Sequence, residues 1–220
     1  MRYLLILLFI SFNSFNSFAQ EEDEKLSKFY LGIGGGAAFR KGDINLSRTP
    51  NGGFSNSYMN NYFSGINLTL LNLGYRINET FGVTVNLNTS GHRFGYFDKW
   101  INYSTISITY LSIGGILSIP TKHFTIDIKP QYAPRVLGFM DGEILDYIGP
   151  VYEFILYGRG FVFGNSIVRS TKKGISYSLD IDYLTTRFDE VRIDGIYYDD
   201  NSTYNSFRIG VGVRYNFRTK

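Results

Sequence analysis

The chain has 220 residues, of which 17% are aromatic and 24 are glycine, while only 19% are charged. This length suits a single domain, and the aromatic and glycine content is typical of strands rather than helices. The absence of cysteine excludes disulfides, thiolate metal sites and a cysteine nucleophile. A net charge of +3 is too small to indicate a nucleic-acid partner.

The N-terminal residues have the pattern of a secretory signal peptide. Arg2 precedes the apolar run 3–10, and Ala19 comes just before the acidic stretch 21–24. The run is far shorter than the roughly 20 residues that a transmembrane helix needs, and a buried N-terminal helix is the alternative. We therefore expect three parts. They are a signal peptide at 1–19, an acidic periplasmic segment at 20–28 and an outer-membrane β-barrel at 29–220.

Eight runs of the remaining chain show the two-residue hydrophobic period of strands. The clearest are residues 29–39, 81–87, 124–132, 175–183 and 207–217. Two other runs change phase, between Leu70 and Leu71 and between Tyr110 and Leu111, which indicates either a one-residue bulge in each or a misjudged boundary.

The sixth run is apolar on both faces, so its orientation rests on its charged residues. Glu153 and Arg159 share one parity. Because an arginine that faces lipid at mid-bilayer costs roughly 2–4 kcal/mol, we predict that the odd-numbered set points inward. Phe154, Leu156 and Val162 would then point outward.

Short and long connections alternate strictly between the runs. Short ones fall at 78–80, 120–123 and 170–174, and longer ones, rich in Gly, Asn, Asp and Tyr, at 40–62, 90–100, 138–150 and 187–204. Eight antiparallel strands with both ends of the chain on the short-turn side produce this order. The prediction is an all-β fold, an eight-stranded antiparallel transmembrane β-barrel.

Alternation alone does not decide which face meets lipid. A soluble, lipocalin-like barrel would place the apolar set inside, around a ligand, whereas a membrane barrel places it outside. Strands of about 10–14 residues are long enough to span a bilayer at a tilt. Aromatic residues lie near the strand ends, as in the aromatic belts at membrane interfaces. They are Phe29, Tyr75, Phe81, Phe124, Tyr215 and Phe217 at one end and Phe39, Phe63, Trp100, Tyr183 and Phe207 at the other. These features favour the membrane barrel.

The inward face then carries charges of both signs. We predict a lumen network of Asp127, Lys129, Arg135, Glu153, Arg159, Asp180, Asp182, Arg208 and Arg214. An eight-stranded barrel is just wide enough for side chains to fill, and buried charges persist only when they are paired. Closure would place Arg208 and Arg214 over the glycines at 32, 34 and 36. The network is either a structural ionic core or a narrow path for ions or protons.

Two stretches carry a resemblance to a known family. Residues 110–120, which end in Ile119-Pro120, and residues 124–136 resemble the central part of the PorT-type small outer-membrane β-barrel family. Residues 207–217 resemble the closing strand that this family shares with OmpA/OmpX-like barrels. The resemblance implies an outer-membrane location and no common enzymatic activity, and it allows a role in protein export.

Residues for catalysis are sparse. Of the two histidines, His123 falls in a short turn, and His92 ends the third run two residues after Ser90. A Ser–His pair could serve as nucleophile and base, but no carboxylate is assigned to orient the imidazole. Asp199 and Asp200 lie in a loop where divalent binding would be weak. We therefore predict no catalytic residue, no metal and no cofactor.

These observations predict the location of the protein in a membrane more specifically than its function. The first interpretation is a Gram-negative outer-membrane barrel with a filled lumen, structural or engaged in surface recognition through four long extracellular loops. The alternatives are a narrow, porin-like transport or export-accessory component and, less favoured, a lipid-modifying enzyme. The expected partners are outer-membrane lipids and the barrel-assembly machinery during biogenesis. We expect a monomer that binds no nucleic acid, and the sequence does not identify an extracellular ligand.

Overall fold

The computed structural model describes residues 28–41, 64–93, 101–146, 149–151, 154–171, 174–193 and 195–217. The strands are β1 (Phe29–Lys41), β2 (Ser64–Arg76), β3 (Phe81–Arg93), β4 (Ile101–Pro120), β5 (Thr125–Asp146), β6 (Gly149–Val151), β7 (Phe154–Ser170), β8 (Ile175–Ile193), β9 (Ile196–Asp199) and β10 (Thr203–Phe217). Within these ranges no helix is long and apolar enough to cross a membrane. The predicted signal peptide lies outside the described residues.

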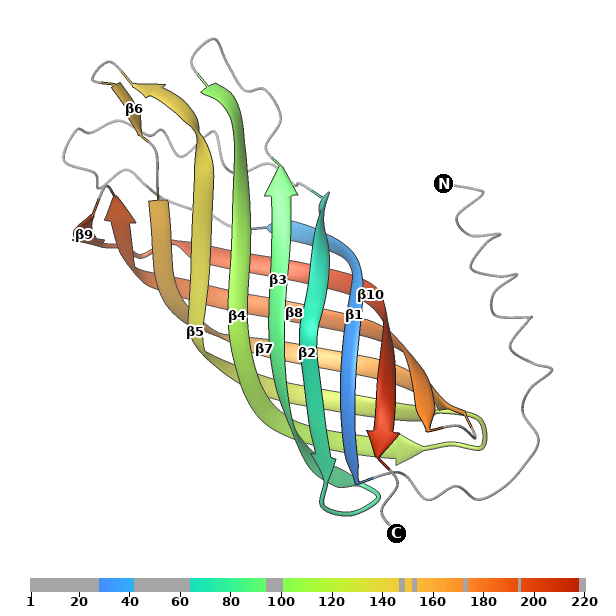
Figure 1. Cartoon of the computed structure of the whole chain (residues 1–220). Helices are drawn as coiled ribbons and strands as arrows, with labels where there is room; N and C mark the ends of the chain where they lie inside the picture. Colours follow the sequence, from blue (N-terminus) through green and yellow to red (C-terminus); the bar gives the residue numbers. More distant parts are fainter. Residues whose placement is uncertain are drawn as a thin grey trace.

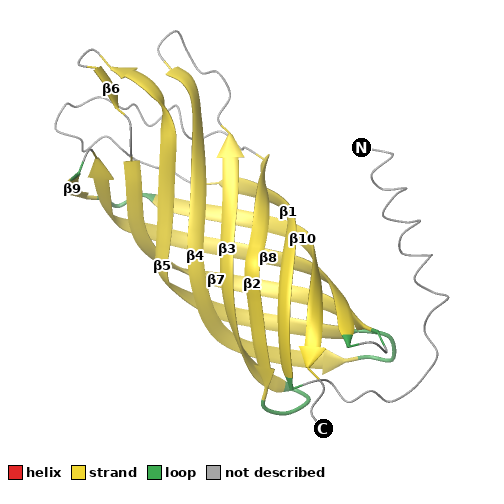
Figure 2. Ribbon diagram, viewed as in Figure 1, coloured by secondary structure: helices red, strands yellow, loops and turns green. Residues whose placement is uncertain are grey.

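Eight long strands of the described chain form one antiparallel sheet that closes on itself (Figure 1; Figure 2). The order around the wall is β10-β1-β2-β3-β4-β5-β7-β8, and β8 pairs again with β10. The short strands β6 and β9 extend β5 and β8 as hairpins. Closure sets Phe29 opposite Phe217 and Phe39 opposite Phe207. The predicted eight-stranded antiparallel barrel is confirmed.

The strands β5 and β8 are longer than predicted. β5 has 22 residues and β8 has 19, so both continue into stretches that the sequence analysis assigned to the loops at 138–150 and 187–204. The hydrophobic alternation breaks there, yet the neighbouring strands still satisfy the backbone donors and acceptors, since Leu137 pairs with Tyr157 and Tyr157 with Glu190. The length of a strand depends on how far the neighbouring strand continues to pair with it, and the hydrophobic pattern of one strand does not show this.

One of the two predicted bulges is present. The β2–β3 register shifts between Thr69 and Leu71, which confirms the phase change in the second run. In β4, by contrast, the register with β3 is unbroken, Ile108 and Tyr110 are buried, and Leu111 is exposed. The register of β4 with β5 does shift between Leu111 and Ile113, but the extra residue lies in β5, so of the two interpretations of this phase change a bulge in β4 itself was wrong.

A bulge that the sequence analysis missed lies in β5. Between Ala133 and Val136, β5 advances three positions while its neighbour β7 advances two, from Gly160 to Gly158. The extra residue changes which parity of β5 points inward. Arg135, within the bulge, is exposed on the outside of the barrel.

The orientation predicted for β7 was also wrong. Leu156 and Val162 are buried, whereas Phe161 and Phe163 are exposed, so the even-numbered set points inward. Arg159 belongs to the outward set, and its side chain is 66% exposed. The prediction rested on the free-energy cost of an arginine that faces lipid at the middle of a bilayer. Arg159 instead lies beyond Phe161, towards the end of the barrel with the long connections.

The outer face carries the predicted aromatic residues near both rims. The exposed ones are Phe29, Tyr75, Phe81, Phe124, Tyr215 and Phe217 at the short-turn end and Phe39, Tyr183 and Phe207 at the other. Phe63 and Trp100 lie outside the described residues. Between the rims the outward side chains are mainly Ile, Leu and Val. This arrangement is typical of a barrel whose outer face meets lipid.

The interior is filled by one apolar cluster and by polar and charged side chains. The apolar cluster lies towards the long-connection end and contains Ile106, Ile108, Tyr110, Ala133, Val136, Leu156, Val162, Leu184, Phe188, Val191 and Tyr204. The ion pairs of Asp127 and Asp180 lie nearer the short turns, and further polar side chains, among them Arg40 and His92, are buried at the long-connection end. The barrel is therefore filled on both sides of its middle, as its small circumference requires.

Candidate functional site

The buried ion pairs are organised around the fully buried carboxylate of Asp127. Arg214 Nη1 donates to its Oδ2 at 2.9 Å, and Arg76 Nη2 lies 3.3 Å from both of its oxygens. The hydroxyl of Ser118 donates to Oδ1 at 2.7 Å. Ser118 lies on the adjacent strand β4, whereas Arg76 on β2 and Arg214 on β10 lie three strands away on either side, so Asp127 joins distant parts of the wall.

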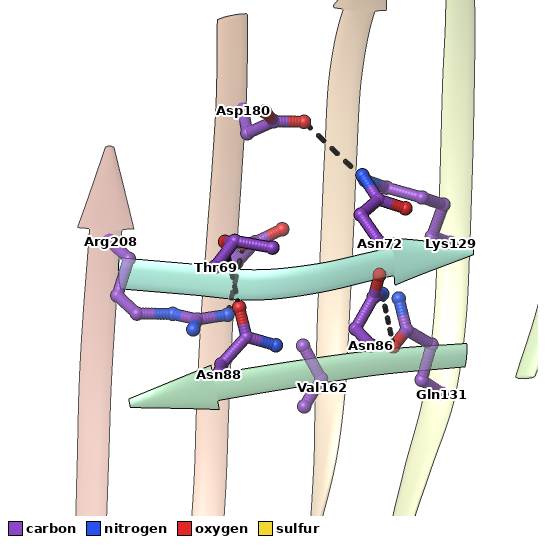
Figure 3. A pocket seen from close by; sticks show the side chains of 10 residues that line it. Thr69, Asn72, Asn86, Asn88, Lys129, Gln131, Val162, Asp180 and Arg208 are labelled. Carbon is purple, nitrogen blue, oxygen red and sulfur yellow. Dashed lines mark hydrogen bonds and ion pairs between the residues drawn. The ribbon is translucent and has the colours of Figure 1, made fainter. Parts of the chain in front are cut away.

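A second carboxylate, Asp180, is linked to the first through Arg214. Arg214 Nη2 lies 3.4 Å from Asp180 Oδ1, and Lys129 Nζ lies 3.5 Å from the same oxygen (Figure 3). The hydroxyls of Ser166 and Ser178 also donate to Asp180. One arginine thus bridges two carboxylates across the lumen, in the geometry that makes buried ion pairs tolerable.

A third pair, together with aromatic rings, completes the network. Arg208 Nη2 donates to Asp182 Oδ2 at 2.9 Å, and the Arg208 Cζ lies 5.1 Å from the centre of the Tyr110 ring. The Arg214 Cζ lies 4.8 Å from the centre of the Tyr30 ring. Stacking of this kind stabilises a desolvated guanidinium. These cations and rings occupy the lumen.

Glycine makes room for one of these arginines, as the sequence suggested. Gly32 pairs with Arg214 across the closing seam, and a Cβ on Gly32 would lie 2.9 Å from Arg214 Cγ. Arg208 instead pairs with Ala38. The small residues of β1 therefore leave the space that the large side chains of β10 fill.

The structure brings six of the nine predicted lumen residues together: Asp127, Lys129, Asp180, Asp182, Arg208 and Arg214. Glu153 lies outside the described residues. The other two, Arg135 and Arg159, were placed in the lumen wrongly, since both are exposed on the outer wall. The β5 bulge turned the first outward, and the parity of β7 turned the second.

Arg76 is a network residue that the sequence analysis missed. It is buried at the end of β2 and pairs with Asp127. The signal was available, because the bulge at Leu70 turns the even-numbered positions of β2 inward from Asn72 to Arg76. If the change of parity is extended to the end of β2, it predicts that Arg76 points into the lumen.

A small polar pocket lies beside the network (Figure 3). It is lined by Thr69, Asn72, Asn86, Asn88, Lys129, Gln131, Val162, Asp180, Asp182 and Arg208. Asn86 Nδ2 donates to Gln131 Oε1 at 2.9 Å, and Thr69 Oγ1 donates to Asn88 Oδ1 at 2.8 Å. The pocket has room for about one water molecule.

His92 is buried inside the barrel rather than at a surface cleft. Its Nε2 lies 2.9 Å from the hydroxyl of Tyr204, and Ser90 is buried on the same face of β3. His123 is exposed in the turn after β4. Asp200 Oδ1 accepts hydrogen bonds from the backbone N–H groups of residues 201 and 202, as in an Asx turn. No cluster of three His, Asp or Glu residues in the described ranges could hold a metal ion.

Comparisons with known proteins place the fold. No family model matches the chain, and no curated protein matches it. Neisserial surface protein A is similar in structure, with a TM-score of 0.50 and 14% identity over 88% of this chain and 100% of that one. The outer membrane protein AlkL, solved in lipid bilayers, has a TM-score of 0.52 and 10% identity over 92% of this chain and 96% of its own. At such low identity the likeness shows the fold alone, and this chain has the fold of small outer-membrane β-barrels.

Proposed function

We propose that this protein is an integral outer-membrane β-barrel with a filled lumen, acting structurally or in surface recognition through its long connections. The observation that supports the proposal is that the barrel is apolar on its outer wall and holds ion pairs inside, the reverse of a soluble protein. Apolar side chains cover the outer wall, and the network that joins Asp127, Arg214 and Asp180 closes the interior. A protein in water does not expose a continuous apolar band of this extent, whereas a lipid bilayer stabilises it.

The recognition role rests on the asymmetry of the two ends. The described turns at one end span only four residues each, as at 77–80 and 121–124. The connections at the other end are long and rich in Tyr and Asn. Tyr supplies contact area at a low entropic cost. On this proposal the short turns face the periplasm, and a monomer displays its long connections outside the cell without a cofactor.

Planar-bilayer recordings test the filled lumen. The purified chain, inserted in a planar bilayer, is expected to give no steady conductance of porin size, because Arg214 reaches across the lumen to Asp127 and Arg208 reaches across it to the Tyr110 ring. Incorporation is verified by co-sedimentation with lipid vesicles. Steady porin-size currents from the inserted chain would contradict the proposal.

A narrow transport or export-accessory role is the second candidate, and the polar pocket beside Asp180 and Arg208 favours it. A polar pocket along the lumen is where a narrow ion or proton path would run, and the resemblance to PorT-type barrels allows an accessory role. Affinity capture of the intact complex from detergent-solubilised membranes discriminates between the two. Stable, stoichiometric envelope partners support the accessory role, and recovery of the monomer alone counts against it.

No enzymatic role is proposed, and His92 provides the test. Replacing His92 by alanine is expected to leave the lipid A profile of the host unchanged, because the imidazole is enclosed in the barrel and bound to Tyr204. Mass spectrometry of extracted lipid A measures this. Tyr204→Phe removes the same hydrogen bond and is the matched control. A profile that changes with His92→Ala but not with Tyr204→Phe would point to catalysis.

A further inference from the structure

Three arginines lie side by side on the outer wall, outside the network described above. Arg159 on β7 pairs directly with Arg187 on β8. Arg135 sits in the β5 bulge opposite the same stretch of β7, between the pairs that Ala133 and Val136 make. All three side chains are exposed, and those of Arg159 and Arg187 are 66% and 71% exposed. We call this row the arginine girdle.

The arginine girdle lies at the border of the apolar outer wall that is nearer the long connections. Phe161 lies two positions from Arg159 along β7, on the side of the short turns. It is exposed and packs against Tyr132 of β5, with ring centres 5.3 Å apart. Residues two apart on one face of a strand are about 7 Å apart along it. The guanidiniums therefore lie at headgroup depth if Phe161 and Tyr132 lie at the edge of the hydrocarbon.

The charge of the girdle is only partly offset within the described chain. Asp189 lies 3.3 Å from Arg159 Nε and 4.0 Å from Arg187 Nε. Exposed pairs of this kind contribute little. Both of these ion pairs use the Nε atom of the arginine, and the Arg135 Cζ lies 5.9 Å from the centre of the Tyr157 ring. Like charges directly opposite on adjacent strands repel each other, so an anion between them would stabilise the wall.

We propose that the arginine girdle binds the phosphate headgroup of a membrane lipid, whose acyl chains lie against Phe161 and Tyr132. Guanidinium groups present forked N–H donors that match phosphate oxygens. The neighbouring apolar rings favour a lipid over a free anion, because a soluble phosphate has nothing to place there. This inference rests on the proposed membrane location of the barrel.

Native mass spectrometry of the full chain tests the proposal, in nanodiscs of phosphatidylcholine, whose phosphodiester is balanced by choline, with phosphatidic acid as the probe that presents a free, anionic phosphomonoester. The protein is expected to retain phosphatidic acid in preference to phosphatidylcholine. The double variant Arg159→Gln/Arg187→Gln is expected to lose about tenfold of this preference, which corresponds to about 1.4 kcal/mol. The variant Lys28→Gln/Lys122→Gln removes the same charge at the short-turn end, where both residues are exposed, and is expected to keep the preference.

The outcomes separate this inference from the proposed function. A chain that fails to enter nanodiscs contradicts both. A chain that enters but retains the two lipids equally, or loses the preference equally in both double variants, contradicts the girdle alone. A competition arm adds inorganic phosphate to the loaded nanodiscs. Displacement of phosphatidic acid at millimolar phosphate would assign the girdle to a soluble anion and overturn the lipid proposal, and retention supports it.

Discussion

Replacing Asp127 by alanine is expected to destabilise the barrel by about 3–5 kcal/mol, the usual effect of removing one member of a buried ion pair. The carboxylate is 0% exposed and faces two guanidiniums, those of Arg214 and Arg76. Without it both cations remain in the lumen, and among the described residues only Arg214 keeps a carboxylate partner, Asp180. Urea unfolding in lipid vesicles, followed by far-UV circular dichroism, measures the change.

An exposed carboxylate provides the matched control. Asp189→Ala removes a carboxylate that is 45% exposed and paired with exposed arginines, so it is expected to change the free energy of unfolding by less than about 1 kcal/mol. The double variant Asp127→Ala/Arg214→Met is expected to recover part of the loss, because it removes one of the cations left behind. Equal effects of Asp127→Ala and Asp189→Ala would show that the network does not stabilise the barrel.

Introducing a side chain at Gly36 is expected to disrupt the seam that closes the barrel. Gly36 pairs with Gly210 across the β1–β10 ladder. A Cβ at Gly36 would collide with the backbone oxygen of Ile209 and the Cα of Gly210, and backbone yields less easily than a flexible side chain. We expect Gly36→Ala to cost about 1–3 kcal/mol, as other overpacked substitutions do, and Gly36→Val to prevent closure.

Gel mobility without heating distinguishes closed barrels from open chains and measures this effect. Gly91→Ala is the control, because the nearest atom to a Cβ there, Ser107 Oγ, is 4.0 Å away. It is expected to migrate as the closed form does. If Gly36→Val folded as completely as Gly91→Ala, the close approach of β1 and β10 would not limit closure.

The strand pattern could be predicted because it is local. Residues 207–217 alternate apolar with polar or glycine on their own, and β10 has its exposed and buried sets as that pattern indicates. The bulge near Leu70 was likewise visible as a phase change in one strand. In β4 the same kind of phase change misled, because Ile108 is buried in the lumen and an apolar side chain does not record whether it faces lipid or an apolar interior.

The candidate site divides in the same way. Asp180 and Asp182 alternate with apolar residues on β8, so their inward orientation follows from parity alone. That Arg214 bridges Asp180 and Asp127 could not be predicted, because the three residues lie on different strands and Arg214 meets Asp127 only across the lumen. The pairing depends on how far each strand is displaced along the axis.

By itself, the sequence determined that this chain forms eight alternating strands with short turns at one end, because side-chain parity and turn length are properties of neighbouring residues. Only the tertiary structure decided which cation meets which carboxylate and on which side of the wall Arg135 and Arg159 lie. The β5 bulge and the orientation of β7 are set by pairing with other strands, and one added residue exchanges inside for outside. Two arginines predicted to fill the lumen therefore lie on the outer wall, beside Arg187.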